Sequence, residues 1–231
     1  MSTVTEGRLL SLFQLSDSFF PIGSYSLSFG LETFAQLGEL RTEADVSSLL
    51  SVFVEQLSTA DCPALIAAYH AAEKSELQIV KAIDHKLASF KNVREFYEGI
   101  TRTGRALLRT VQSFASSKLL TQYTSLVERK ETPGTYAVCL GMVSQSLQID
   151  AESAVMLMLY TSTISMLGAA IRLGHITHEQ AQRILYNSRS LIQHAAKKSA
   201  TIPWTQLRQF SPILDIMGMK HAYLPARMFS C

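Results

Sequence analysis

The chain has 231 residues, of which 47% are hydrophobic and 17% are charged. This composition supports a large buried core and excludes a disordered chain, while the length allows one large domain or two small ones. The formal net charge is +2, and the densest basic run is the pair Lys197-Lys198. Because nucleic-acid-binding proteins usually concentrate basic residues on one face, this balance argues against a nucleic-acid partner.

Three features bear on the compartment in which the protein works. The first residues lack the charged and then apolar pattern of a signal peptide. The three cysteines, Cys62, Cys139 and Cys231, are far apart and odd in number, as is typical of free thiols in a reducing cytoplasm. The uncharged stretch 153–171 contains several Ser and Thr residues, which favours a buried core helix over a membrane span. We therefore expect a cytoplasmic protein with no membrane partner.

Apolar residues recur at helical spacing along most of the chain, and no alternating strand pattern or internal repeat appears. Capping boxes are predicted at Thr42 with Asp45 and at Thr177 with Gln180. The pattern predicts an all-α fold of roughly nine or ten helices around one buried central helix. The predicted segments are 8–15, 29–37, 46–57, 61–69, 76–89, 93–114, 119–127, 136–147, 151–173 and 178–192.

Two glycines, Gly99 and Gly104, lie inside the predicted helix 93–114. Glycine costs about 1 kcal/mol relative to alanine in a helix interior, so we expect a neighbouring element to pack closely there. The same glycine spacing occurs in phosphate-binding loops. Such loops also need a Lys, a Ser or Thr and a preceding strand, and this stretch has none of them in the required places.

The stretch Ser16–Glu32 stands out because it interrupts two predicted helices yet is half apolar. It contains Pro21, Gly23 and several serines between bulky apolar residues. A surface loop is usually polar because its backbone faces water. We therefore expect an ordered segment whose Ser and Asp side chains bond its own backbone. It is either a structural corner or a recognition site.

The sequence offers no catalytic constellation and no metal site. The serines of the stretch 16–32 have no local His to activate them, so a nucleophilic triad has no support. His175 and His178 are three residues apart, but they flank a predicted helix start and have no neighbouring Cys or carboxylate cluster. Cys139 lies on an apolar helix and is expected in the core. We predict that the chain is not an enzyme.

The last 21 residues, 211–231, mix apolar and charged residues without a clean stripe. The domain division is therefore 1–210 for an all-α domain and 211–231 for a C-terminal tail. A terminal segment of this kind is ordered only when it docks. Either the tail packs on its own domain or a partner protein orders it.

Four stretches, in order, together resemble the UreF family of urease accessory proteins. The first is Leu15–Glu32, which is similar to the N-terminal signature of that family. The others are Arg102-Thr-Gly-Arg105 in a helix, Ala169–Gly174 before a Gln-containing helix start, and the region from Met219-Lys-His221 to Ala226–Ser230. They cover nearly the whole chain.

The resemblance implies an all-α, non-enzymatic protein that dimerises and joins a second accessory protein, UreD (also called UreH), and the GTPase UreG. The assembly delivers nickel to apo-urease, so nickel is handled by the complex and no cofactor is bound tightly by this chain. In the family the C-terminal tail is associated with docking to UreD/UreH and with the surface that receives UreG.

The resemblance also implies partner-binding residues. Glu32 and Tyr25 match an acid and an aromatic of the N-terminal signature, and Arg172 matches a basic position after the buried helix. Arg227 matches an arginine near the C-terminus, and the motif before it contains the remaining candidates, Lys220 and His221.

Two departures from the family weaken any proposal of tight nickel binding by this chain. Leu27 and Thr135 stand where the family often has His. Two alternatives remain open beside the scaffold. The chain could regulate GTP hydrolysis by UreG, as an activator or a brake, with Arg172 as an arginine finger. It could also carry nickel directly on His175, His178 or His221.

Overall fold

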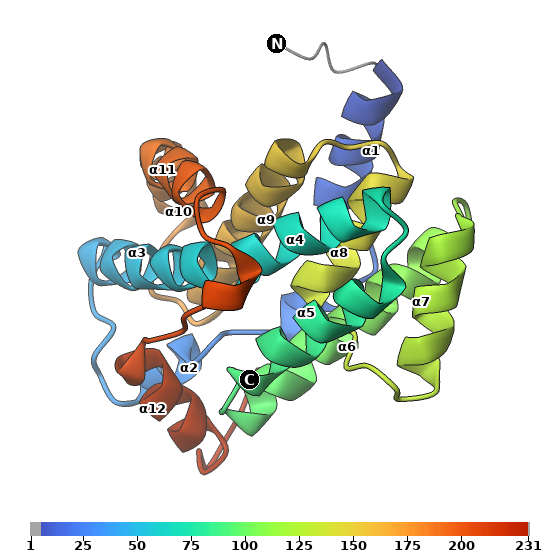
Figure 1. Cartoon of the computed structure of the whole chain (residues 1–231). Coiled ribbons are helices and arrows are strands. Elements are labelled where there is room, and N and C mark those ends of the chain that lie inside the picture. The colour runs from blue at the N-terminus through green and yellow to red at the C-terminus, as the bar shows by residue number, and fades with distance from the viewer. Residues whose placement is uncertain (1–5, 231) are drawn as a thin grey trace.

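The structure, a computed structural model, describes residues 6–230 of the chain. Within that range every regular element is a helix, which confirms the predicted all-α class (Figure 1). The α-helices are α1 (Glu6–Ser16), α2 (Leu31–Gln36), α3 (Glu43–Thr59), α4 (Asp61–Glu73), α5 (Leu77–Ser89), α6 (Arg94–Gln112), α7 (Lys118–Glu128), α8 (Tyr136–Ser146), α9 (Ala151–Arg172), α10 (His178–Asn187), α11 (Arg189–Ser199) and α12 (Pro212–His221). Two short 3-10 helices, η1 (Ser24–Ser26) and η2 (Trp204–Gln206), complete the described elements.

The number of α-helices exceeds the prediction of roughly nine or ten, because the apolar pattern of the sequence shows neither the break between α10 and α11 nor the helix in the tail. The predicted helix 178–192 is divided at Ser188, which ends α10 and precedes α11. The tail forms a helix of its own, α12, with Pro212 in its first turn. Proline is tolerated there because its missing N–H would have no intrahelical partner.

Helices α4, α8 and α9 form the centre of the molecule (Figure 1). α9 contacts α1, α2, α3, α4, α8, α10 and α11, so the expected central helix is confirmed. One side of α9 nevertheless approaches the surface, where Tyr160 is exposed and Thr161, Ser162 and Ser165 are half-buried. These polar side chains lie where α9 faces the segment between α1 and α2.

Two stretches are long and apolar enough to cross a membrane by length and composition. They are Glu43–Glu73, which includes α3 and α4, and α9. Within the fold, 67% and 56% of their most apolar windows are buried. Packing in the protein core accounts for this apolar composition.

The predicted caps are largely confirmed. Both capping boxes are present, Thr42 with Asp45 before α3 and Thr177 with Gln180 before α10. The carboxylate of Asp150 accepts a hydrogen bond from a backbone N–H in the first turn of α9. From the sequence, Asp61 was also expected to cap the helix that follows it. That prediction is wrong, because Ala60 occupies the N-cap position of α4 and Asp61 is the first residue of the helix. Its buried carboxylate pairs instead with Lys91, whose Nζ lies 2.6 Å away.

Close packing is confirmed at one of the two helix glycines. A Cβ added at Gly104 would lie 2.2 Å from the carbonyl oxygen of Gly134 and 3.0 Å from Sγ of Cys139. Only a residue without a side chain lets α6 approach the start of α8 so closely. Cys139 is buried, as predicted, and so is Cys62. Cys231 lies outside the described residues.

A buried carboxylate ties the segment between α7 and α8 to α5. Asp84 on α5 accepts hydrogen bonds from the hydroxyls of Tyr123 (2.9 Å), Thr132 (2.7 Å) and Thr135 (2.6 Å). It also accepts from the backbone N–H groups of Gly134 (2.7 Å) and Thr135 (2.9 Å). Five donors on one fully buried carboxylate fix the path of the chain into α8.

Candidate functional site

The stretch Ser16–Glu32 is an ordered corner between α1 and α2. Its short helix η1 is tied to α9, because Ser165 Oγ donates to the carbonyl of Ser24 at 3.0 Å. Gly30 has a left-handed φ of 85°, and an added Cβ would lie 3.3 Å from Cβ of Met217 on α12. Glycine is therefore required both by the backbone and by the close approach of the tail.

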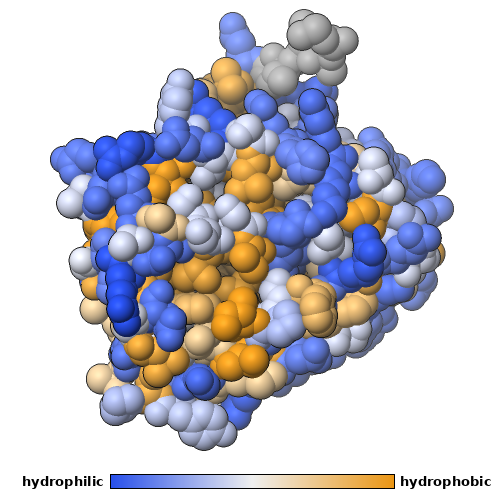
Figure 2. All heavy atoms as spheres, turned by 90° about the vertical axis from the view of Figure 1, so that its left-hand side faces the viewer, coloured by the Kyte–Doolittle hydropathy of each residue, from blue (hydrophilic) through white to orange (hydrophobic). Residues whose placement is uncertain are grey.

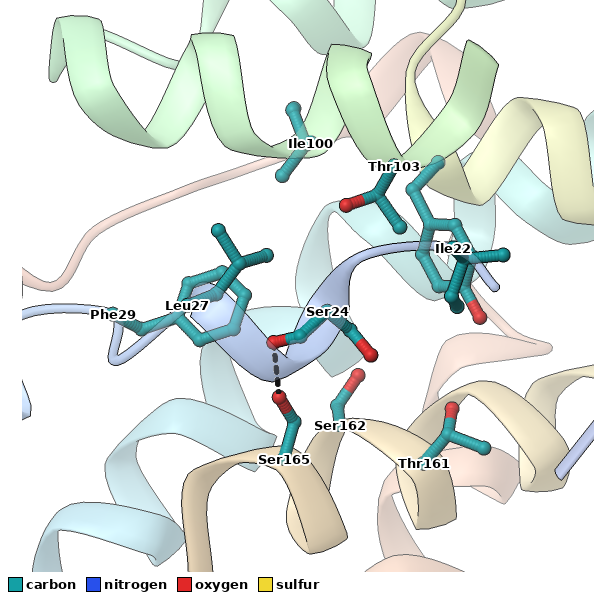
Figure 3. A pocket seen from close by; sticks show the side chains of 10 residues that line it. Ile22, Ser24, Leu27, Phe29, Ile100, Thr103, Thr161, Ser162 and Ser165 are labelled. Carbon is teal, nitrogen blue, oxygen red and sulfur yellow. Dashed lines mark hydrogen bonds between the residues drawn. The ribbon is translucent and has the colours of Figure 1, made fainter. Parts of the chain in front are cut away.

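A cavity of about 40 Å³ lies between η1, α6 and α9 (Figure 3). The labelled side chains around it are Ile22, Ser24, Leu27, Phe29, Ile100, Thr103, Thr161, Ser162 and Ser165. The hydroxyl of Thr103 is buried and has no hydrogen-bond partner among the described residues. A water molecule fits this volume and would satisfy that hydroxyl.

The tail is joined to the body through His221, the last residue of α12. Its Nε2 lies 2.9 Å from Oε2 of Glu32 on α2, and its Nδ1 lies 2.6 Å from Oε2 of Glu95 on α6. The imidazole is fully buried and the Glu32 side chain is nearly so. Two carboxylate acceptors require two N–H donors, so this geometry calls for an imidazolium that bridges two helices.

Glu32 binds the tail a second time, beyond the histidine. Its carboxylate accepts from the backbone N–H groups of Met228 (2.7 Å) and Phe229 (3.1 Å). Burial tends to raise the pKa of Glu32, but the Met228 N–H, His221 and the Phe229 N–H together hold that pKa below its usual value. The charged form of Glu32 therefore stabilises the docked tail.

Arg172, at the end of α9, packs between two aromatic rings. Its guanidinium carbon lies 3.7 Å from the ring centroid of Tyr25 and 4.3 Å from that of Phe229. Its Nε donates to the carbonyl of Gly168 at 3.1 Å, and burial lowers the pKa of the guanidinium. These contacts join α9, the corner and the tail, and two aromatic rings contact the guanidinium.

A second arginine holds the tail from α6. Arg102 donates to Ser230 Oγ (2.6 Å) and Ser26 Oγ (3.3 Å), and the Ser230 N–H donates to the carbonyl of Ser26 at 2.9 Å. Arg227 completes the arrangement through an ion pair with Glu95, in which Nη1 and Oε1 are 2.8 Å apart. We call this set of residues the tail junction: Tyr25, Ser26, Glu32, Glu95, Arg102, Arg172, His221, Arg227, Phe229 and Ser230.

The structure brings five of the six predicted partner-binding residues into the tail junction. These are Tyr25, Glu32, Arg172, His221 and Arg227. The sixth, Lys220, is exposed, and no side-chain contact connects it to the junction. Tyr25 is 73% exposed, so its outer surface is free for a partner. Glu32 and His221 are buried, and their contact with each other holds the tail in position.

From the sequence we did not identify Ser26, Glu95, Arg102, Phe229 and Ser230 as members of the site. Arg102 was visible, because it begins one of the four family-like stretches. Glu95 had no such signal, since it is one of several charged residues on an amphipathic helix. Its contact with His221 spans 126 positions of the chain, a separation that helical periodicity cannot reveal.

The two departures from the family have local structural reasons. Leu27 is 2% exposed and belongs to a small core cluster with Val93 and Phe96. Thr135 gives two hydrogen bonds to Asp84. Within residues 6–230, no group of three or more His, Cys, Asp or Glu side chains is placed to hold a metal ion.

Comparison with known proteins leads to the same family as the four stretches of the sequence. The model of the family described as UreF matches residues 40–189, which is more than half of the chain. The chain belongs to the UreF family. It is 32% identical to the urease accessory protein UreF of Bacillus sp. (strain TB-90), over 96% of this chain and 98% of that protein. It is 30% identical to UreF of Trichodesmium erythraeum (strain IMS101), over 96% of both chains.

The chain is also 29% identical to the urease accessory protein UreF 1 of Brucella melitensis biotype 1, over 96% of this chain. Because they cover 96% of this chain, these matches include the corner Ser16–Glu32 and at least part of the tail, which the family model does not reach. The chain is thus a urease accessory protein of the UreF family, and this family is not catalytic.

Proposed function

We propose that this UreF chain is a scaffold that joins UreD/UreH and the GTPase UreG for delivery of nickel to apo-urease. Family membership supports the urease context. The observation that carries the scaffold role is the tail junction, in which side chains from α2, α6 and α9 hold a tail that could otherwise project into solvent. A scaffold binds its partners more tightly when its binding surface is already ordered, because less conformational entropy is lost on binding.

The outer face of α12 is the proposed contact for UreD/UreH. Ile213, Ile216 and Met219 recur at intervals of three residues and are exposed, although the opposite face of α12 is buried. Figure 2 looks onto the side of the molecule where α2, α3 and α12 lie and shows apolar side chains gathered there. Exposed apolar patches of this kind commonly mark protein–protein contacts. Whether UreD/UreH orders the tail stays a prediction.

The proposed contact for UreG is the exposed part of the tail junction around Tyr25, Arg172 and Arg227, with the neighbouring Lys220. Guanidinium groups make directional contacts to carboxylates at interfaces. Because the guanidinium of Arg172 is held by two aromatic rings and by the carbonyl of Gly168, its geometry supports an anchoring role more than that of an arginine finger. We also propose that the chain is a cytoplasmic homodimer and that nickel is cargo of the complex.

Replacing Arg227 with alanine is expected to reduce co-purification of the chain with UreD/UreH and UreG several-fold. The ion pair with Glu95 is partly exposed, so its loss should lower the free energy of unfolding by no more than about 1 kcal/mol. A suitable control is Arg183→Ala, which removes an exposed ion pair with Glu43 elsewhere on the surface. Equal co-purification of Arg227→Ala and the control would contradict the proposed role of the junction.

A further inference from the structure

One face of α6 carries three arginines in a row. Arg102, Arg105 and Arg109 are all exposed, while Phe96, Leu107, Leu108 and Val111 on the same helix are buried. Residues three and four positions apart lie on the same face of an α-helix. The seven positions from Arg102 to Arg109 span about 10 Å along the helix axis.

None of the three arginines has a carboxylate within ion-pair distance among residues 6–230. By contrast, Arg94 on the same helix pairs with Glu98, with Nε and Oε1 2.7 Å apart. Arg102 contacts only two serine hydroxyls, and Arg105 has one long contact, 3.5 Å, to the carbonyl of Pro133. Like charges at this spacing repel one another. An arginine row without counter-charges is complementary to an acidic surface.

We propose that Arg102, Arg105 and Arg109 form a docking face for an acidic segment of a partner protein, with Asp or Glu side chains at helical spacing. The inference rests on the proposed function, since the partner is taken to be a member of the urease assembly. Arg102 also contacts Ser230, so the docking face begins at the tail junction and extends it along α6. Guanidinium groups match carboxylates in bidentate geometry better than ammonium groups do.

A protein partner is favoured over nucleic acid because the row is short and the net charge of the chain is only +2. Nucleic-acid sites usually combine a wider basic field with many phosphate contacts. A matching acidic helix needs carboxylates on one face over two turns, and three arginines suffice to recognise it.

The test compares two triple variants in binding to purified UreD/UreH and, separately, to UreG. The first variant is Arg102→Glu, Arg105→Glu and Arg109→Glu. The control is Lys74→Glu, Lys118→Glu and Lys197→Glu, which changes the net charge equally at dispersed exposed positions. We expect the arginine variant to bind one of the two partners about tenfold or more weakly than the control, with the loss greatest at low salt.

Arg102 also holds the tail, so a double variant, Arg105→Glu with Arg109→Glu, separates docking from tail position. It leaves the bonds of Arg102 to Ser26 and Ser230 intact and should still weaken the same partner. If the arginine variants and the control bind both partners equally, the inference is overturned while the scaffold proposal stands. If the wild-type chain binds neither partner, both proposals fail. Binding of a duplex DNA oligonucleotide in place of the weakened partner would also overturn the inference.

Discussion

Replacing Asp84 with alanine is expected to lower the free energy of unfolding by about 5 kcal/mol or more, because each buried donor left unsatisfied costs about 1–3 kcal/mol. The carboxylate of Asp84 receives five hydrogen bonds, all from buried groups of Tyr123, Thr132, Gly134 and Thr135. Without the carboxylate, the segment that leads into α8 would lose all five of these bonds. The consequence would reach the centre of the fold, where α8 packs on α4 and α6.

Urea unfolding followed by circular dichroism measures this effect, and recovery of soluble protein is a second readout. Thr132→Val provides a graded control, since it removes one donor and keeps the side-chain shape. We expect it to cost about 1 kcal/mol. A loss for Asp84→Ala no larger than that for Thr132→Val would show that the five bonds contribute little to the fold.

Replacing His221 with alanine is expected to destabilise the docked tail by about 3–5 kcal/mol, because it leaves the buried carboxylate of Glu32 and the half-buried carboxylate of Glu95 without the imidazole that bridges them. Glu32 would keep its two backbone N–H donors, and Glu95 would keep only Arg227. Releasing the tail exposes both carboxylates to water, so the chain can relieve the strain by local opening. The effect should therefore appear first in α12 and the residues after it.

Amide hydrogen exchange across residues 212–230 reports this local opening directly. We expect protection there to fall by orders of magnitude, while α4 and α8 retain theirs. His194→Ala removes an exposed histidine on α11 and should leave exchange unchanged. Uniform loss of protection throughout the chain would instead mean that the tail and the body unfold together, which would contradict a local role for His221.

The sequence predicted the helical class, the central helix and both capping boxes, because these features depend on local periodicity and on residues three or four positions apart. It predicted a helix cap at Asp61, which instead forms a buried ion pair with Lys91. An aspartate at the start of a helix is compatible with either role. The sequence predicted one helix, 178–192, where the structure has α10 and α11, because Ser188 is compatible with a helix interior. α12 was missed because its apolar residues face both the body and the solvent.

The tail junction could be predicted only in part. Tyr25, Glu32, Arg172, His221 and Arg227 were found through resemblance to a family, and no local rule brings them together. Their meeting depends on pairings across nearly 200 positions of the chain, such as Glu32 with His221. Glu95 and Phe229 complete the site through contacts of the same kind, which become visible only when the tail is packed against α2 and α6.

Co-expression of the chain with UreD/UreH and UreG, followed by sizing of the purified material, tests the scaffold role most directly. We expect one species that contains all three proteins, with two copies of this chain, and no stable association of UreG with UreD/UreH when the chain is omitted. The scaffold role would be contradicted if those two proteins associated equally well without the chain, or if the chain eluted alone in their presence.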